Sequence, residues 1–233
     1  LAAGRPGSIV SVRLMRRLTQ LSGIPDGPYA QLQLGLQVVT EQDQRNFTGL
    51  DMDATTAGTA ECGTSCTAIT LAAPLNLRYG RLMLENSYGP ESENLPLQLR
   101  AEYWNGADFV LNTQDQCSPL ASNRVLDAVT GAMPLQMSKE SPYSGAASQD
   151  VTAQGVNAQL QNGQAQSNNA PLLWLQAPQQ RGQGRLQYQL DDHPWLQYDW
   201  DADNSYNDNP AADFVFGRFR GNPRQISWRE LFR

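Results

Sequence analysis

Alternation of apolar and polar residues is the feature that most limits how this chain can fold. In three stretches every second residue is apolar, and most of the residues between are polar or small. A spacing of two fits a β-strand with one buried and one solvated face, and it does not fit a helix, which repeats about every 3.6 residues. The apolar positions are Leu32, Leu34, Leu36 and Val38, then Leu95, Leu97, Leu99, Ala101 and Tyr103, and finally Leu186, Tyr188 and Leu190. Arg100 and Glu102 are expected on the solvated face of the second strand.

Short strands separated by turn residues are expected along most of the remaining chain. Further strand candidates cover residues 8–15, 78–85, 109–112, 172–176, 214–219 and 226–232. Asn105-Gly106, between two apolar runs, is the strongest hairpin signal. Residues 14–21 have an alternative interpretation as a short amphipathic helix. The pattern predicts an all-β fold, an antiparallel β-sandwich of Ig-like or jelly-roll-like type with long loops.

One segment, residues 144–170, has low complexity. It consists mainly of Ala, Gln, Gly, Ser, Asn and Thr, with Val151, Val156 and Leu160 as its larger apolar residues. A long loop, a weakly patterned strand pair and a flexible linker all fit this composition. The regular spacing of the apolar residues favours ordered, peripheral structure. We therefore expect residues 1–233 to form a single sandwich domain, the C-terminal fragment of a larger protein.

Composition restricts the partners and the chemistry. Lys and Arg total 17 against 23 acidic residues, for a net charge of -6, which argues against nucleic acid as a partner. His193 is the one histidine in the chain, so a metal site with two imidazoles is excluded. No apolar run reaches the roughly 20 residues that a membrane-spanning helix needs, and no membrane insertion is expected.

The three cysteines leave the redox state open. Cys62 and Cys66 lie four residues apart in a Gly/Thr-rich stretch, and Cys117 follows much later. A disulfide between Cys62 and Cys66, in an oxidising compartment, is the favoured interpretation. Three ordinary reduced thiols are the alternative.

An acidic stretch near the C-terminus is the sharpest candidate site. Asp199, Asp201 and Asp203 alternate along the chain, and Asn207 and Asp208 follow. Calcium takes six to eight oxygen ligands, which one acidic loop can supply in large part. These five residues are therefore predicted to bind Ca²⁺ in a loop that is not an EF-hand. The alternative is a solvated acidic turn that pairs with Arg218, Arg220 or Arg224.

Aromatic residues accompany the acidic stretch. An exposed indole or phenol face beside carboxylates and a cation suits a sugar ligand, so Trp200 and Tyr206 are predicted to bind a ligand. Core packing is the alternative role for these rings.

Enzymatic activity is not expected. His193 has no serine motif of the kind that a catalytic triad needs. Glu91 with Glu93, or Glu85 with Glu102, would serve a glycosidase only if the two carboxylates faced each other across a cleft, and such acids are usually surface residues.

An ordered series of short motifs gives a family resemblance. The series is Arg78-Tyr-Gly-Arg-Leu82, Glu85-Asn-Ser-Tyr-Gly89, Leu95-Pro-Leu97, Arg100-Ala-Glu-Tyr-Trp-Asn-Gly106, Asn112-Thr-Gln-Asp-Gln-Cys117, Pro194-Trp-Leu-Gln-Tyr-Asp-Trp200, Phe216-Gly-Arg-Phe-Arg-Gly-Asn222 and Ile226-Ser-Trp-Arg-Glu-Leu-Phe232. It resembles the C-terminal domain of MshQ-type proteins, which are large surface components of mannose-sensitive haemagglutinin (MSHA) type IV pili in Gram-negative bacteria.

The resemblance implies an exported, non-enzymatic module at the cell surface. Such a module would act in pilus assembly or surface attachment, at the pilus tip, with minor pilins or other pilus subunits as partners and a surface glycan as a further ligand. Residues 226–232 are expected to close the sheet, or alternatively to be donated to a neighbouring subunit. The alternative function is a calcium-dependent carbohydrate-binding domain.

Overall fold

The computed structural model describes residues 25, 27–32, 35–36, 69–70, 74–139 and 148–217. Within these residues every regular element is a β-strand apart from two single turns of 3-10 helix, η1 (Ser122–Arg124) and η2 (Pro194–Leu196). No helix of the described ranges has the length and apolar character to cross a membrane. The predicted all-β fold is confirmed. The strands and helix expected over 8–15, 14–21 and 226–232 lie outside the described residues.

The chain divides into two compact units. The smaller unit comprises Asp26–Tyr79 and Trp104–Asp108, and the larger unit comprises the rest. Two antiparallel pairs lie in the smaller unit, namely β1 (Tyr29–Leu32) with β4 (Leu75–Leu77) and β2 (Gly35–Leu36) with β3 (Ile69–Thr70). The larger unit holds the hydrophobic core and the candidate site.

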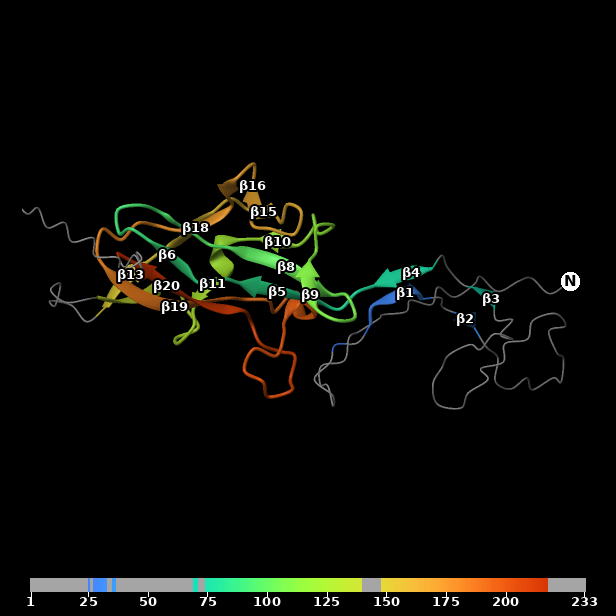
Figure 1. Ribbon diagram of the computed structural model, residues 1–233. Coiled ribbons are helices and arrows are strands. Elements are labelled where there is room, and N and C mark those ends of the chain that lie inside the picture. The colour runs from blue at the N-terminus through green and yellow to red at the C-terminus, as the bar shows by residue number, and fades with distance from the viewer. Residues whose placement is uncertain are drawn as a thin grey trace, which may run out of the picture. The chain divides into compact units, whose positions relative to one another are not determined.

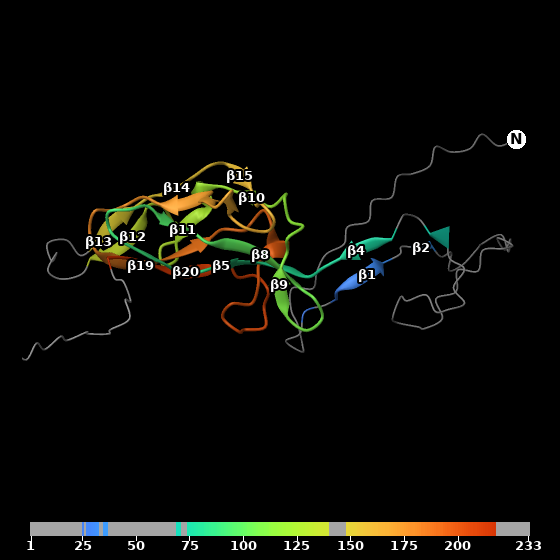
Figure 2. The ribbon, with the colours of Figure 1, turned by 45° about the horizontal axis from the view of Figure 1, so that its top comes forward.

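A six-stranded sheet forms one layer of the larger unit, and we call it the large sheet. Its order is β13 (Ser148–Val151), β12 (Leu135–Lys139), β19 (Gly182–Tyr188), β20 (Ala211–Phe216) and β6 (Ser87–Gly89), while β11 (Val125–Asp127) also pairs with β19. All pairs are antiparallel except β20 with β6, which is parallel. Figures 1 and 2 show β19 and β20 together in this layer.

The remaining strands of the larger unit form shorter sheets. One has the order β14 (Ala153–Gly155), β18 (Leu173–Leu175) and β7 (Leu95–Pro96), and another has the order β5 (Gly80–Leu84), β8 (Leu99–Trp104) and β9 (Phe109–Leu111). Two further pairs are β10 (Pro119–Leu120) with β15 (Ala158–Gln159) and β16 (Gln166–Ser167) with β17 (Ala170–Pro171). The Asn105-Gly106 turn follows β8, as predicted, and the Asn105 side-chain oxygen accepts N–H bonds from Ala107 and Asp108, both at 2.8 Å.

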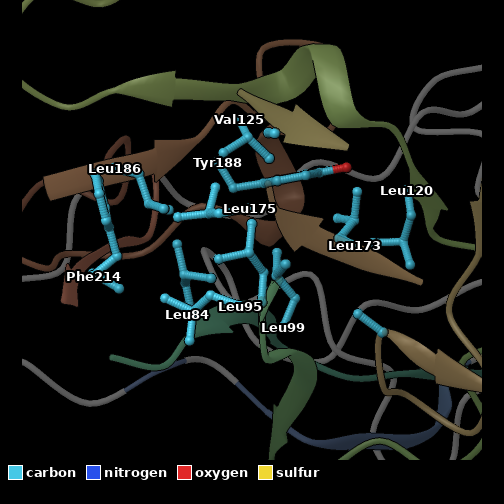
Figure 3. Close-up of a cluster of buried hydrophobic side chains, with 14 of the residues drawn as sticks. Leu84, Leu95, Leu99, Leu120, Val125, Leu173, Leu175, Leu186, Tyr188 and Phe214 are labelled. Carbon is cyan, nitrogen blue, oxygen red and sulfur yellow. The ribbon is translucent and has the colours of Figure 1, made fainter. Parts of the chain in front are cut away.

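The core lies where the large sheet meets the shorter sheets. Leu84, Leu95, Leu99 and Leu175 of the shorter sheets meet residues of the large sheet (Figure 3), including Leu186, Tyr188 and Phe214. The alternating residues predicted to be buried are buried from Leu95 to Ala101 and from Leu186 to Leu190. Tyr188 keeps its hydroxyl satisfied in this core, because it accepts from Ala121 N at 3.1 Å and donates to Pro119 O at 3.2 Å.

The prediction of a solvated face is wrong at Glu102. Its side chain is 5% exposed, although it lies between buried Ala101 and half-buried Tyr103 at a position expected to face water. Two arginines cover the carboxylate, Arg81 from β5 and Arg100 from β8 itself. Burial of a charge is tolerated where opposite charges and hydrogen bonds compensate it.

The low-complexity segment carries strands where it is described, from residue 148 onward. Val151 and Leu160 are buried in the core cluster, and Val156 is exposed. Its left-handed Asn168 and Asn169 form the turn between β16 and β17, a conformation that asparagine tolerates better than most residues.

Candidate functional site

The acidic residues form a loop between η2 and β20, and we define the acidic loop as residues 199–208. An antiparallel bridge closes it, with Tyr198 N to Asp208 O at 3.2 Å and Asp208 N to Tyr198 O at 3.0 Å. The loop stands out from the sheets in Figure 1. Ala202 and Asn204 both have a left-handed backbone, with φ of 64° and 66°, which lets the chain turn sharply inside the loop.

Three of the predicted metal ligands converge in this loop. Carboxylate oxygens of Asp199, Asp201 and Asp203 all lie within 4.8 Å of one another. Among the described residues, this is the one cluster of three such side chains close enough to hold a metal ion. The loop's own backbone holds these side chains: the two oxygens of Asp199 accept from Asp203 N at 2.9 Å and from Asn204 N at 3.0 Å. Such short-range bonds from Asp to N–H groups a few residues on are typical of turns.

The other two predicted ligands have different surroundings. Asp208 Oδ2 accepts from Trp200 N at 2.9 Å and Asp201 N at 3.3 Å, so this carboxylate links the two sides of the loop. Partial burial raises the pKa of Asp208 above its ordinary value, although the N–H of Trp200 opposes the shift. Asn207 is exposed.

An aromatic cluster supports the base of the loop. The ring of Tyr198 makes edge-on contacts with Phe109, Trp200 and Tyr206, at centroid distances of 5.1, 5.2 and 5.3 Å. Tyr206 is buried, and Trp200 is 37% exposed. Of the two residues predicted to bind a ligand, Trp200 is therefore the one that presents surface to solvent.

Arg81 of β5 packs against the rings of this aromatic cluster. Its guanidinium carbon lies 3.8 Å from the ring centroid of Phe109, 4.8 Å from that of Tyr198 and 5.0 Å from that of Trp200. Cation–π contacts of this length are attractive, the more so away from water. Sequence reasoning missed Arg81 and Phe109, because nothing local connects them to a loop more than 80 residues away along the chain.

Glu102 joins Arg81 to a second arginine. Glu102 Oε2 accepts from Arg81 Nε at 2.7 Å, and Glu102 Oε1 accepts from Arg100 Nε at 2.7 Å. Arg100 also pairs with Glu85. Glu102 therefore balances two positive charges where β5 and β8 pair, since Arg81 and Glu102 are register partners.

One known protein family matches the part of the chain that carries this site. A family model described as DUF6701, fourth domain, matches residues 78–231. The chain belongs to this family. No curated protein and no solved structure matches the chain. Arg81, Glu102 and the acidic loop all lie within the matched part of the DUF6701 fourth domain.

His193 of this DUF6701 domain packs on a tryptophan. The ring centroids of His193 and Trp195 are 5.0 Å apart. Burial and the nearby positive charge of Arg124 lower the pKa of His193, and Asp192 opposes them, so the imidazole is mainly neutral at pH 7. Arg124 itself pairs with Asp192 at 2.8 Å.

The predicted Cys62–Cys66 disulfide lies outside the described residues. Cys117 is exposed, and its N–H donates to Asp115 Oδ1 at 3.1 Å. Asp115 is buried and also accepts from Ser118 N at 2.9 Å and from Ser118 Oγ at 2.6 Å. In the DUF6701 domain this carboxylate therefore fixes the turn that carries Cys117.

Proposed function

We propose that this domain is an exported, non-enzymatic structural or adhesive module of an MSHA-type pilus-associated protein, acting at the surface of a Gram-negative bacterium. The ordered motif series from Arg78 to Phe232 supports the pilus setting, because several short motifs occur together in the order of MshQ-type C-terminal domains. Minor pilins or other pilus subunits are the proposed partners, in pilus assembly or in attachment at the pilus tip.

The use of the buried carboxylates supports a scaffold rather than a catalyst. Glu102, Asp115 and Asp127 are the buried acids of the described residues, and each accepts several bonds from the protein's own N–H, O–H or guanidinium groups. A general acid or base needs a carboxylate oxygen within hydrogen-bond reach of substrate. These three side chains instead hold strands and turns in place, which is the requirement of a rigid scaffold.

Deleting the domain from its parent protein tests the proposal in the bacterium. We expect cells that lack residues 78–231 to lose surface attachment several-fold, and wild-type protein supplied in trans to restore it. Surface pilin is measured in the same cells by immunoblot, because a loss of pilin indicates an assembly role and normal pilin indicates an adhesive role. Normal attachment by cells that still export the shortened parent protein would contradict the proposal.

A calcium-dependent carbohydrate-binding domain is the second candidate. The observation that favours it is the position of Trp200, which is partly exposed and lies between Asp199 and Asp201 in the chain. A sugar ring on this indole would have its hydroxyls near the converging carboxylates. On this hypothesis, binding to a glycan array is abolished by EDTA and by Trp200→Ala.

Calcium binding is tested separately by thermal unfolding. Extracellular calcium modules have Kd values of about 10⁻⁴–10⁻³ M, so 10 mM Ca²⁺ would stabilise the folded state by about 1.4–2.7 kcal/mol. For a domain of this size we expect a rise in Tm of roughly 3–10 °C, reversed by EDTA. The variant Asp201→Asn removes one of the converging carboxylates and should show a much smaller rise. An unchanged Tm in wild-type protein would exclude a calcium site of this affinity.

A further inference from the structure

The outer face of the large sheet carries a hollow that the proposed function does not use. It has a volume of about 600 Å³ and is lined by residues of β6, β20, β19 and β12, and of β11 and the loop after it. This size lies within the range of about 300–1,000 Å³ that is usual for small-ligand sites. Figure 1 shows β20 and β19 side by side in this layer, with β6 along its edge.

One row of side chains crosses the floor of the hollow. In the strand register Ser138 is opposite Gln183, Gln183 is opposite Val215, and Val215 is opposite Tyr88. Neighbouring strands lie about 4.8 Å apart, so the row extends roughly 14 Å across four strands. Tyr88 is 56% exposed at one end, and Val215 is largely buried next to it.

Polar groups flank this row on the same face. Arg185 and Asp213 are register partners and form an ion pair at 3.5 Å, and both are well exposed. Gln183 is exposed, as is Ser138. The hollow therefore offers an amide, a hydroxyl, a guanidinium and a carboxylate on the same sheet face as one exposed aromatic ring.

Charge in the hollow disfavours an anionic ligand. Arg185 is the one cation among the described residues that line the hollow, and its charge is already balanced by Asp213. Asp127 also lines the hollow, and its oxygens accept from Thr130 N and Gln136 N. Phosphate or sulfate groups would need an excess of positive charge that these residues do not provide.

A peptide strand does not suit this surface either. Strand addition requires the free backbone groups of a sheet edge. The hollow lies on the face of the sheet, where the backbone groups of β19 and β20 already bond to neighbouring strands. Recognition in the hollow must therefore come from side chains.

We propose that this hollow binds a neutral oligosaccharide, with a sugar ring packed on Tyr88 and its hydroxyls bonded to Gln183, Arg185 and Asp213. Ring C–H faces pack well on a phenol, and sugar hydroxyls both donate and accept, as this mixture of side chains requires. The site is separate from the acidic loop in the strand topology and contains none of its residues. Binding here is therefore independent of calcium.

Binding of defined glycans in EDTA tests the site. The full chain is applied to an array of neutral hexasaccharides of mannose, glucose, galactose and N-acetylglucosamine, with sialylated and sulfated glycans as the anionic arm. We expect at least one neutral hexasaccharide to bind in EDTA. Its Kd should rise roughly tenfold or more in Tyr88→Ala, since ring contact and buried area are lost together, and should change little in Tyr88→Phe.

Two further variants complete the design. Trp195→Ala removes another exposed aromatic ring, one outside the hollow, and should bind as wild type does. Gln183→Ala removes an exposed amide from the floor and should weaken binding even if Tyr88→Ala does not fold. Absence of neutral-glycan binding in EDTA, a preference for anionic glycans, or wild-type affinity in folded Tyr88→Ala would each overturn the proposal. None of these results bears on the deletion experiment in cells, which reports the pilus role by itself.

Discussion

Replacing Glu102 with Ala is expected to destabilise the domain by about 3 kcal/mol, at the lower end of the cost of breaking a buried ion pair. The side chain is 5% exposed and balances both Arg81 and Arg100. Without it, Arg81 keeps its charge in a largely buried position, and its remaining partners among the described residues are aromatic rings. Arg100 is more exposed than Arg81. Solvent therefore screens the charge of Arg100 and reduces its share of the lost stability.

Urea unfolding at pH 7 measures this effect, with Glu85→Ala as the matched control. Glu85 pairs with the same Arg100 but is far more exposed than Glu102, so its loss should cost less than about 1 kcal/mol. Glu102→Gln keeps the side-chain volume and removes the charge, so its loss of unfolding free energy should lie between those of Glu102→Ala and Glu85→Ala. Equal urea midpoints for Glu102→Ala and Glu85→Ala would show that the burial of Glu102 adds nothing to the stability that its ion pairs provide.

Loss of Glu102 should also loosen the base of the acidic loop. Arg81 contacts the rings that support the loop, and Glu102 fixes the direction of its guanidinium. Faster amide hydrogen exchange at Tyr198 and Asp208, whose backbones bond to each other, would report this coupling.

The strands of the sandwich were predictable from local pattern, but their pairing was not. Leu95, Leu97 and Leu99 alternate within one short stretch, so their shared burial follows from sequence alone. The parallel pairing of β6 with β20 joins residues more than 120 positions apart, and no local signal specifies it. Glu102 was misplaced for the same reason, since one of the arginines that cover it lies on another strand, β5.

The candidate site likewise combines features that the local sequence predicts with features that depend on distant segments. The convergence of Asp199, Asp201 and Asp203 comes from alternate positions in one tight loop, and the spacing predicted it. The cluster of Arg81, Phe109 and Tyr198 combines three distant segments. The hollow beside Tyr88 depends on strand register across four strands, which period-two alternation cannot supply.

Asp127 provides the second large expected effect, through hydrogen bonds rather than ion pairs. Its Oδ1 accepts from Val129 N at 2.9 Å and Thr130 N at 2.8 Å, and its Oδ2 accepts from Gln136 N at 3.0 Å. Bonds to a charged acceptor contribute about 1.5–3 kcal/mol each. In Asp127→Asn the amide NH₂ would replace one of the two acceptor oxygens, and we expect a loss of about 3 kcal/mol at pH 7.

The same residue predicts a pH dependence with a definite sign. Burial raises the pKa of Asp127, but the N–H donors of Gln136, Thr130 and Val129 outweigh it, so the pKa is lowered overall. A carboxyl group with a lowered pKa stabilises the fold fully above the unfolded pKa of about 3.9, and the contribution is lost as the pH falls through the folded pKa. The gap in unfolding free energy between wild type and Asp127→Asn should therefore shrink as the pH is lowered below about 4.

Urea unfolding of both proteins at pH 7 and at pH 3 measures this gap. Asp150→Asn is the control, because exposed Asp150 also bonds to Gln136, but through the side-chain amide at the surface. Its gap from wild type should be small at both pH values. If the Asp127→Asn gap were instead unchanged at pH 3, the charge of the carboxylate would not be what holds this turn. Hydrogen bonds to a neutral acceptor would then be enough to hold the turn, and the loop that carries Val129, a residue lining the hollow, would survive the loss of that charge.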